Sequence, residues 1–264
     1  MPGYLKGEKT MNTLTKTDGS NPKVNKSASS LIGGKDIRIL SLSMMPDDKI
    51  CPARNIAGCA DDCLKNSGRG VMRNVIDGRA ARSAFWHLDQ DGFLTQLKKE
   101  LHNFIKLCAR QNVVPVTRLN VLSDIPWEKH LDFADEFRAL FAYDYTKLAA
   151  RLGKTPENYH LMFSYSAAPE YQNQVKIALK SDVPITAVFR GGLPTQFLGR
   201  EVYDGDISDI DNIAQRGKII GLRVKGHEAK KSRSPFVILN PDLVPNQTLI
   251  DENNVEFITG VRYG

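Results

Sequence analysis

The chain has 264 residues and a mass of 29.4 kDa, which allows one large domain or two small ones. Hydrophobic residues make up 41% and charged residues 25%, a composition that excludes a wholly disordered chain. No apolar run approaches the ~18 residues of a membrane-spanning helix and no secretory signal is apparent, so we expect a cytoplasmic protein without a membrane partner. Four cysteines are too few for a disulfide scaffold.

The first 34 residues carry half of the formal net charge of +6. They hold five lysines against one glutamate and one aspartate, and they lack hydrophobic periodicity. We therefore expect residues 1–34 to be a disordered basic tail and residues 35–264 to form a single α/β domain. Such a tail could bind nucleic acid weakly through its positive charge, but a solvated N-terminal segment without a binding role is the favoured interpretation.

Hydrophobic periodicity after the tail predicts strands and helices in alternation. The strongest pattern is an apolar stripe over 91–110. Strands are predicted at 36–43, 113–119, 140–143, 159–165, 185–189, 218–225 and 235–239, and helices at 71–87, 91–110, 129–140, 147–151 and 170–180, with a polar stretch at 191–217. This order predicts an α/β fold: a partial (β/α) barrel, or an open, mostly parallel sheet of about six strands with crossover helices.

Three cysteines lie within 13 residues of the loop that follows the first strand. Cys51, Cys59 and Cys63 form a C-x7-C-x3-C arrangement in a loop that contains Gly and Pro. Cys108 instead lies on the apolar stripe of a predicted helix, and we expect it to be buried. Three thiolates suit a [4Fe–4S] cluster with one iron left open. Zinc is the alternative, with His87 as a conceivable fourth ligand, and three unrelated cysteines are the third interpretation.

A three-cysteine loop after the first strand of a β/α chain resembles the layout of radical-SAM enzymes. That resemblance implies that the open iron chelates S-adenosylmethionine. The cysteine spacing departs from the usual x3-x2 pattern of those enzymes, and no clear Gly-Gly-Glu follows the second predicted strand. The resemblance is therefore one of topology.

Polar residues follow the carboxyl ends of the predicted strands, which share one edge of a parallel sheet. Carboxylates and cations there suit a small-molecule or nucleoside-containing ligand, although each residue alone is more typical of a turn or cap. The catalytic candidates are Asp124, Asp144 and Lys147, and the cofactor-binding candidates are Asn120, Ser123, Ser164, Ser166 and Arg190.

Two further polar segments are interpreted as surface. The acids that alternate over 203–211 favour an acidic turn over a loop for a divalent cation. The basic residues of 225–233 favour a solvated loop over a phosphate contact.

Four sets of segments carry a family resemblance: Leu40 through Cys63, Arg118 to Glu128, Tyr143–Lys147 with Val188–Pro194, and Val202–Asp206 with Gly221–Gly226. Together they resemble a group of uncharacterised bacteriophage and mobile-element proteins, the gene product 88 family. The resemblance implies a phage or plasmid origin, hence a host-cell cytoplasm, and no particular activity.

The leading hypothesis is a protein that binds a [4Fe–4S] cluster through the cysteine loop, and that acts as a radical-SAM-like enzyme on an unknown substrate. The alternative is a non-enzymatic accessory protein with a structural zinc, which binds a host protein or nucleic acid. Zinc hydrolysis or deamination is disfavoured because the His-x-Glu and Pro-Cys-x-x-Cys pattern is missing.

Overall fold

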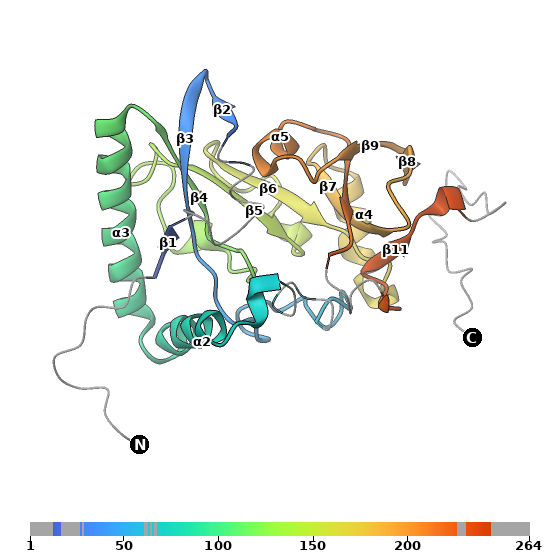
Figure 1. Ribbon diagram of the computed structural model, residues 1–264, viewed down its shortest axis with the longest axis horizontal. Helices are drawn as coiled ribbons and strands as arrows, with labels where there is room; N and C mark the ends of the chain where they lie inside the picture. Colours follow the sequence, from blue (N-terminus) through green and yellow to red (C-terminus); the bar gives the residue numbers. More distant parts are fainter. Residues whose placement is uncertain are drawn as a thin grey trace.

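The computed structural model describes residues 13–16, 27, 29–60, 63, 65, 68–225 and 231–243. Its centre is a run of six parallel strands that follow one another along the chain and across the sheet. The predicted α/β fold with an open, largely parallel sheet is therefore confirmed (Figure 1). The six strands are β3 (Lys35–Ser41), β4 (Val114–Arg118), β5 (Phe141–Thr146), β6 (Tyr159–Ser164), β7 (Ile185–Arg190) and β10 (Ile219–Arg223).

Short strands extend the sheet beyond this core. β9 (Arg200–Asp204) runs parallel to β10 and pairs antiparallel with β8 (Gln196–Phe197), although the sequence predicts a polar stretch there. Period-2 hydrophobicity is weak in β9 because most of its side chains are polar, so pattern alone does not reveal this strand. β11 (Val237–Leu239) pairs with the second half of β7, whereas β6 pairs with the first half of β7.

Two strands lie within the segment predicted to be a tail. β1 (Thr15–Lys16) and β2 (Leu31–Ile32) both pair antiparallel with β3. Leu14 is buried, and its backbone N–H donates to the carboxylate of Glu100 at 2.8 Å. The prediction of disorder is therefore wrong for these two strands, while most of residues 1–28 lie outside the described part of the chain.

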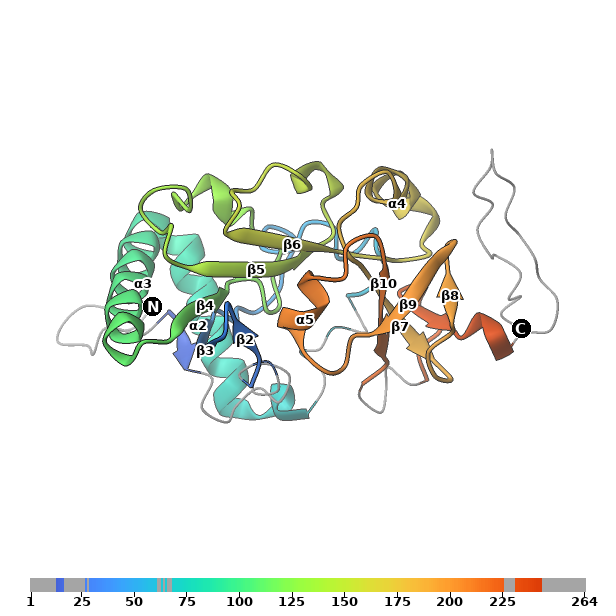
Figure 2. The same ribbon diagram turned by 90° about the horizontal axis from the view of Figure 1, so that it is seen from above.

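Helices cover the sheet on both faces. α2 (Arg73–Leu88) and α3 (Gln90–Gln111) are joined at Asp89, whose side chain accepts a hydrogen bond from Gly92 N and so caps α3. α4 (Gln172–Leu179) and the short α5 (Asp209–Ile213) lie on opposite faces (Figure 2). The apolar stripe of α3 is buried as predicted, Cys108 included.

Two predicted helices are replaced by tighter structure. The segment 129–140 forms turns after the 3-10 helix η3 (Trp127–Lys129), and residues 149–151 form the 3-10 helix η4 (Ala149–Arg151). The buried side chains of the first segment are Leu131, Phe133, Phe137 and Leu140, and the last three keep a helical spacing, which explains the prediction. The backbone instead closes turns, because Asp132 Oδ1 accepts from Asp135 N and Asp132 O accepts from Phe137 N.

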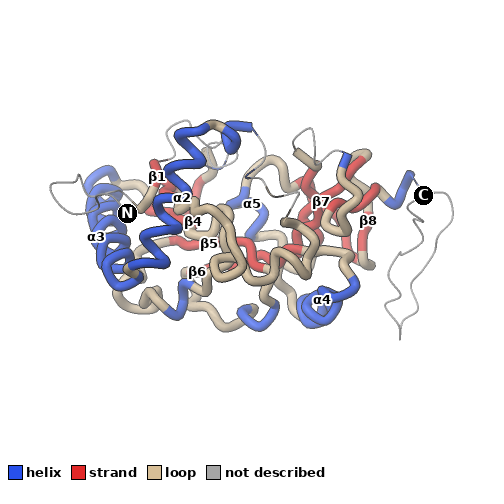
Figure 3. The backbone as a smooth tube through the Cα atoms, turned by 90° about the horizontal axis from the view of Figure 1, so that it is seen from below, coloured by secondary structure: helices blue, strands red, loops and turns tan. Residues whose placement is uncertain are grey.

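Three hydrophobic clusters pack against the sheet. One lies beneath α2 and α3, one beneath α4, and one on the opposite face beneath α5. The loop between β3 and α2, which carries the cysteines, contributes Ala53, Ala57 and Cys59 to the cluster beneath α4. That loop runs along the carboxyl edge of the strands, and loops form much of this side of the molecule (Figure 3).

Candidate functional site

The cysteine loop is a chain of tight turns at the carboxyl edge of the sheet. Cys51 N donates to Asp47 O, Arg54 N donates to Cys51 O, and Cys59 N donates to Arg54 O. Cys51 and Cys59 are buried and Cys63 is partly buried, and all three are free thiols. Backbone hydrogen bonds within the loop therefore fold the predicted three-cysteine loop back on itself, and the Cys51 and Cys59 side chains are buried.

Lys147, the residue after β5, interacts electrostatically with all three thiols. Burial disfavours its charged form. The negative charges that Cys59 and Cys51 carry once they ionise, together with the Asp124 carboxylate, outweigh burial, so the pKa of Lys147 is raised. Its ammonium lies 5.4 Å from the centre of the Phe236 ring. Among the described residues we find no hydrogen-bond acceptor or carboxylate paired with this ammonium.

Burial acts strongly on the thiol of Cys51. Burial raises its pKa to about 12, and the Lys147 cation opposes that rise only in part. The free thiol is therefore protonated at neutral pH. Ionisation of this thiol requires a further positive charge, such as a metal centre, beside it.

Asp124 lies in the same neighbourhood and is fully engaged by the protein. Its carboxylate accepts hydrogen bonds from Lys147 N at 2.7 Å and from Thr146 Oγ1 at 2.8 Å. Arg151 Nη1 donates to the same carboxylate at 2.8 Å. The structure thus brings this catalytic candidate beside Lys147, with its oxygens turned toward internal donors.

Asp144 and Asn120 form a second polar centre. Asp144 accepts hydrogen bonds from Asn120 N at 2.7 Å and from Tyr159 OH at 2.7 Å. Asn120 Oδ1 accepts from Ser123 Oγ, Ile125 N and Trp127 Nε1. These predicted site residues therefore hold the loop after β4 in shape, and their polar groups already have partners within the chain.

The remaining candidates follow β6 and β7. Ser166 Oγ donates to Ala57 O at 2.7 Å, which ties the end of β6 to the cysteine loop. Arg190 Nη1 donates to Ser232 O at 2.8 Å, and the side chain of Ser164 is buried. Of these three, Ser166 makes a direct contact with the cysteine loop.

Two residues that the sequence analysis overlooked support the site. Arg151 is buried and makes a two-point ion pair with Glu128, at 2.9 and 2.8 Å, besides its contact with Asp124. The Tyr171 hydroxyl is within hydrogen-bond distance of Lys147 O and Ser164 O. The spacing of Asp124 and Glu128 on one turn is a signal for a basic partner, but nothing in the sequence identifies Arg151 as that partner.

A buried ion pair lies on the opposite face of the sheet. Arg118 Nη1 donates to Asp209 Oδ2 at 3.0 Å, and the Tyr145 hydroxyl donates to Asp209 Oδ1 at 2.7 Å. The sequence places Asp209 in an acidic surface turn, whereas this carboxylate is fully buried.

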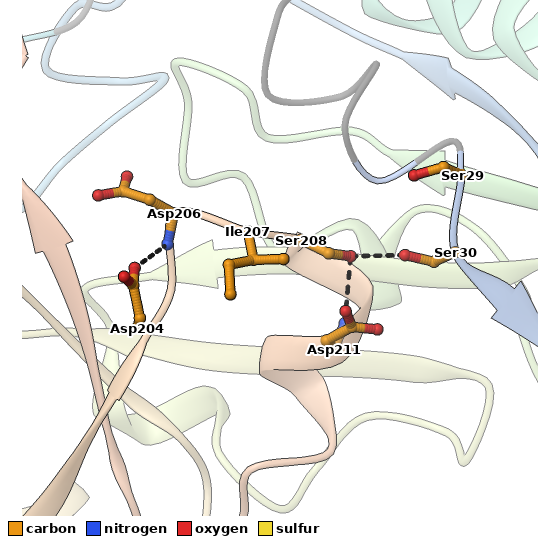
Figure 4. Close-up of a pocket in the computed structure, with 7 residues that line it drawn as sticks. All are labelled: Ser29, Ser30, Asp204, Asp206, Ile207, Ser208 and Asp211. Atoms are coloured by element: carbon orange, nitrogen blue, oxygen red, sulfur yellow. Dashed lines mark hydrogen bonds between the residues drawn. The ribbon is translucent and has the colours of Figure 1, made fainter.

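An open pocket of about 590 Å³ adjoins α5 and is separate from the cysteine loop (Figure 4). Ser30 and Ser208 share a hydrogen bond there, and Asp204 accepts from Asp206 N. Arg223 forms ion pairs with Asp204 and Asp206. Asp204 and Asp206 therefore have internal countercharges, whereas the predicted acidic surface turn is wrong at the buried Asp209.

Among the described residues, no group of three or more His, Cys, Asp or Glu side chains is placed so that it could hold a metal ion. His87, the conceivable fourth zinc ligand, instead contacts Asp47 at 2.7 Å. No helix in the described part of the chain has the length and apolar character needed to cross a membrane.

The fold and the site define an open α/β protein with a cysteine loop and a partly buried lysine at the carboxyl edge of its parallel sheet. The family profile described as gene product 88 matches residues 8–238, so the chain belongs to that family. No curated protein matches the chain. No solved structure matches it either.

Proposed function

We propose that the chain binds a [4Fe–4S] cluster through Cys51, Cys59 and Cys63, with Lys147 as the neighbouring countercharge. The observation that carries this proposal is the Lys147 ammonium, which interacts electrostatically with three thiols of one loop. Lys147 is partly buried, and an anionic centre in front of it offsets the hydration that its charge has lost.

The charge of the centre agrees with this arrangement. Three thiolates around an oxidised cluster give a net charge of about −1, which a single lysine balances. Arg151 shares the Asp124 carboxylate, so Asp124 offsets the charge of Lys147 only in part. The donors are also chemically suited, because thiolates are the ligands that iron–sulfur clusters prefer.

Zinc receives less support than a cluster. A structural zinc site needs four donors that converge on one point, and a catalytic site needs three donors and a water. The described residues contain no such convergent group. A cluster spreads its thiols over several iron atoms, so convergence on one point is not its requirement.

The resemblance to radical-SAM layout extends the proposal to enzyme activity. With S-adenosylmethionine at the open iron, a bound cluster supplies one-electron reductive cleavage followed by hydrogen abstraction. The chain would contribute the shielding: Phe236 covers Lys147, and Ser234 donates a hydrogen bond to Gly58 O of the cysteine loop. This part of the proposal rests on the cluster and on strand-end topology.

The test is the iron and sulfide content of anaerobically reconstituted protein. We expect about four iron and four sulfide per chain, with broad absorbance near ~400 nm. Cys59→Ser should lose them, and Cys108→Ser, which changes a buried thiol of α3, should keep them. One zinc without iron would support the structural-zinc alternative, and a chain that binds neither metal would contradict both.

A further inference from the structure

The backbones that carry Cys51 and Lys147 are joined through one residue, Asp124. Asp124 N donates to Ile50 O at 2.9 Å, immediately before Cys51. The Asp124 carboxylate accepts from Lys147 N at 2.7 Å. Asp124 therefore links the start of the cysteine loop to the end of β5.

Arg151 fixes the orientation of that carboxylate. The side chains of Arg151 and Asp124 are 5% and 2% exposed, and Arg151 is held from its other side by Glu128 and by the Tyr159 hydroxyl. A buried ion pair of this kind is weak evidence for net stability, since desolvation offsets much of its attraction. Its hydrogen bonds, however, allow only one geometry, which points to a positioning role.

The pair also sets the local charge. Asp124 places its carboxylate 2.7 Å from Lys147 N, and its own N–H bonds the residue before Cys51, so its negative charge lies beside both residues. Glu128 binds the same arginine, but within the described part of the chain it makes no hydrogen bond to the cysteine loop or to Lys147. Glu128→Gln is therefore the control, because glutamine keeps an acceptor for Arg151 and leaves the Asp124–Arg151 hydrogen bond and the two joined backbones in place.

We propose that Asp124, oriented by Arg151, is a positioning residue that holds Cys51 in register with Lys147 and tunes the charge beside the thiols. It acts through these two residues and touches no ligand itself. The inference rests on the proposed function for its cluster readout, but the register of Cys51 and Lys147 is a property of the protein without metal.

The first test needs no cluster. In the metal-free, reduced protein, the alkylation rate of Cys51 by iodoacetamide is measured by mass spectrometry, with Cys108 as the internal reference. Asp124→Asn should raise the Cys51 rate relative to Cys108 by about tenfold, which corresponds to a loss of about 1.4 kcal/mol in the free energy that protects the thiol. Glu128→Gln should change it little. Equal ratios in both variants and wild type would overturn the positioning role.

The second test uses the reconstituted protein. Asp124→Asn should reduce iron retained against a chelator and raise the reduction potential of the remaining cluster, because removal of a negative charge favours the reduced, more negative state. Thr146→Val, which removes one hydrogen bond to Asp124 and keeps its charge, should leave the potential nearer to wild type. An unchanged potential in Asp124→Asn would contradict the charge role.

The two failures are distinguishable. Wild-type protein that takes up no iron contradicts the proposed function, while the alkylation ratio still decides whether Asp124 positions Cys51. Wild-type protein that holds iron, together with Asp124→Asn protein of unchanged alkylation, iron and potential, contradicts the positioning role alone. A variant too unstable to purify is replaced by Thr146→Val, for which a Cys51 rate equal to wild type counts against the proposal.

Discussion

Asp144 is a carboxylic acid at the centre of the first predicted site, and it is 1% exposed. Burial raises its pKa to about 7, although hydrogen bonds from Tyr159 and Asn120 N favour the ionised form. The folded protein therefore binds a proton at Asp144 more tightly than the unfolded chain, whose aspartate titrates near its ordinary value of 3.8. This contribution to stability is complete below about pH 4 and is lost as pH rises toward 7.

We expect Asp144→Asn to remove that pH dependence. Between pH 5 and 7 the free energy of unfolding of wild type should fall by an extra amount on the order of 2 kcal/mol relative to the variant. Urea titrations of both proteins at the two pH values measure this difference, whatever the absolute stability of the variant. Parallel pH profiles would show that Asp144 is already ionised at pH 5.

The roles of individual residues were harder to predict from the sequence than the helices and strands. The sequence predicts Asn120 and Asp144 as site residues because they follow parallel strands, but their mutual hydrogen bonds depend on the register of β4 and β5, which a sequence pattern does not contain. The cysteine loop was predictable, since three thiols in 13 residues stand out without any fold. The role of Arg151, which binds Asp124, was not predictable, because an arginine in a short helical segment is a common occurrence.

At the scale of elements, the cysteine loop is covered by the segment that leads into β11. Gly58 has a φ of +63°, and a Cβ there would lie 2.8 Å from Pro235 Cγ. Ser234 Oγ donates to Gly58 O, and Ala167 N donates to Pro235 O. The glycine is thus required both by its backbone conformation and by the close approach of Pro235.

Gly58→Ala should therefore cost more than backbone strain alone. Gly153 has a φ of +71° with nothing near its missing Cβ, so Gly153→Ala measures the conformational cost, about 1–2 kcal/mol. Gly58→Ala should lose a further ~1–3 kcal/mol from the collision with Pro235. The free energies of unfolding of the two variants give the difference directly, and equal losses would mean that the Pro235 segment moves away freely.

Whole elements were predicted well where periodicity is strong and poorly where polar residues mask it. The six parallel strands and α3 follow from apolar runs of clear period. β9 and α5 lie in a polar stretch, and α5 is recognisable chiefly by Ser208, whose hydroxyl accepts from Ile210 N and caps it. The helix predicted at 129–140 failed because its aromatic residues pack against Tyr159 and His102 from turns instead.

For the whole molecule, alternation of strands and helices predicts a largely parallel sheet, but not the order of its strands, because a partial barrel and an open sheet both fit that alternation. Pattern cannot show how the short terminal strands complete that sheet. β1 and β2 add to the first strand of the core, and β11 adds to the edge of β7 that β6 leaves free. These pairings join segments distant in the sequence, so they depend on tertiary contacts.

The continuous sheet and the packing beneath it predict that the clusters under α3 and α4 unfold together. Leu152 packs against both clusters, and β5 and β6 pair along five residues between them. Cys108 is buried in the first cluster and Cys59 in the second. Pulse alkylation of metal-free protein across a urea titration should therefore give the same midpoint for both thiols. Separate midpoints would divide residues 35–264 into two independently unfolding units and contradict the single-domain prediction.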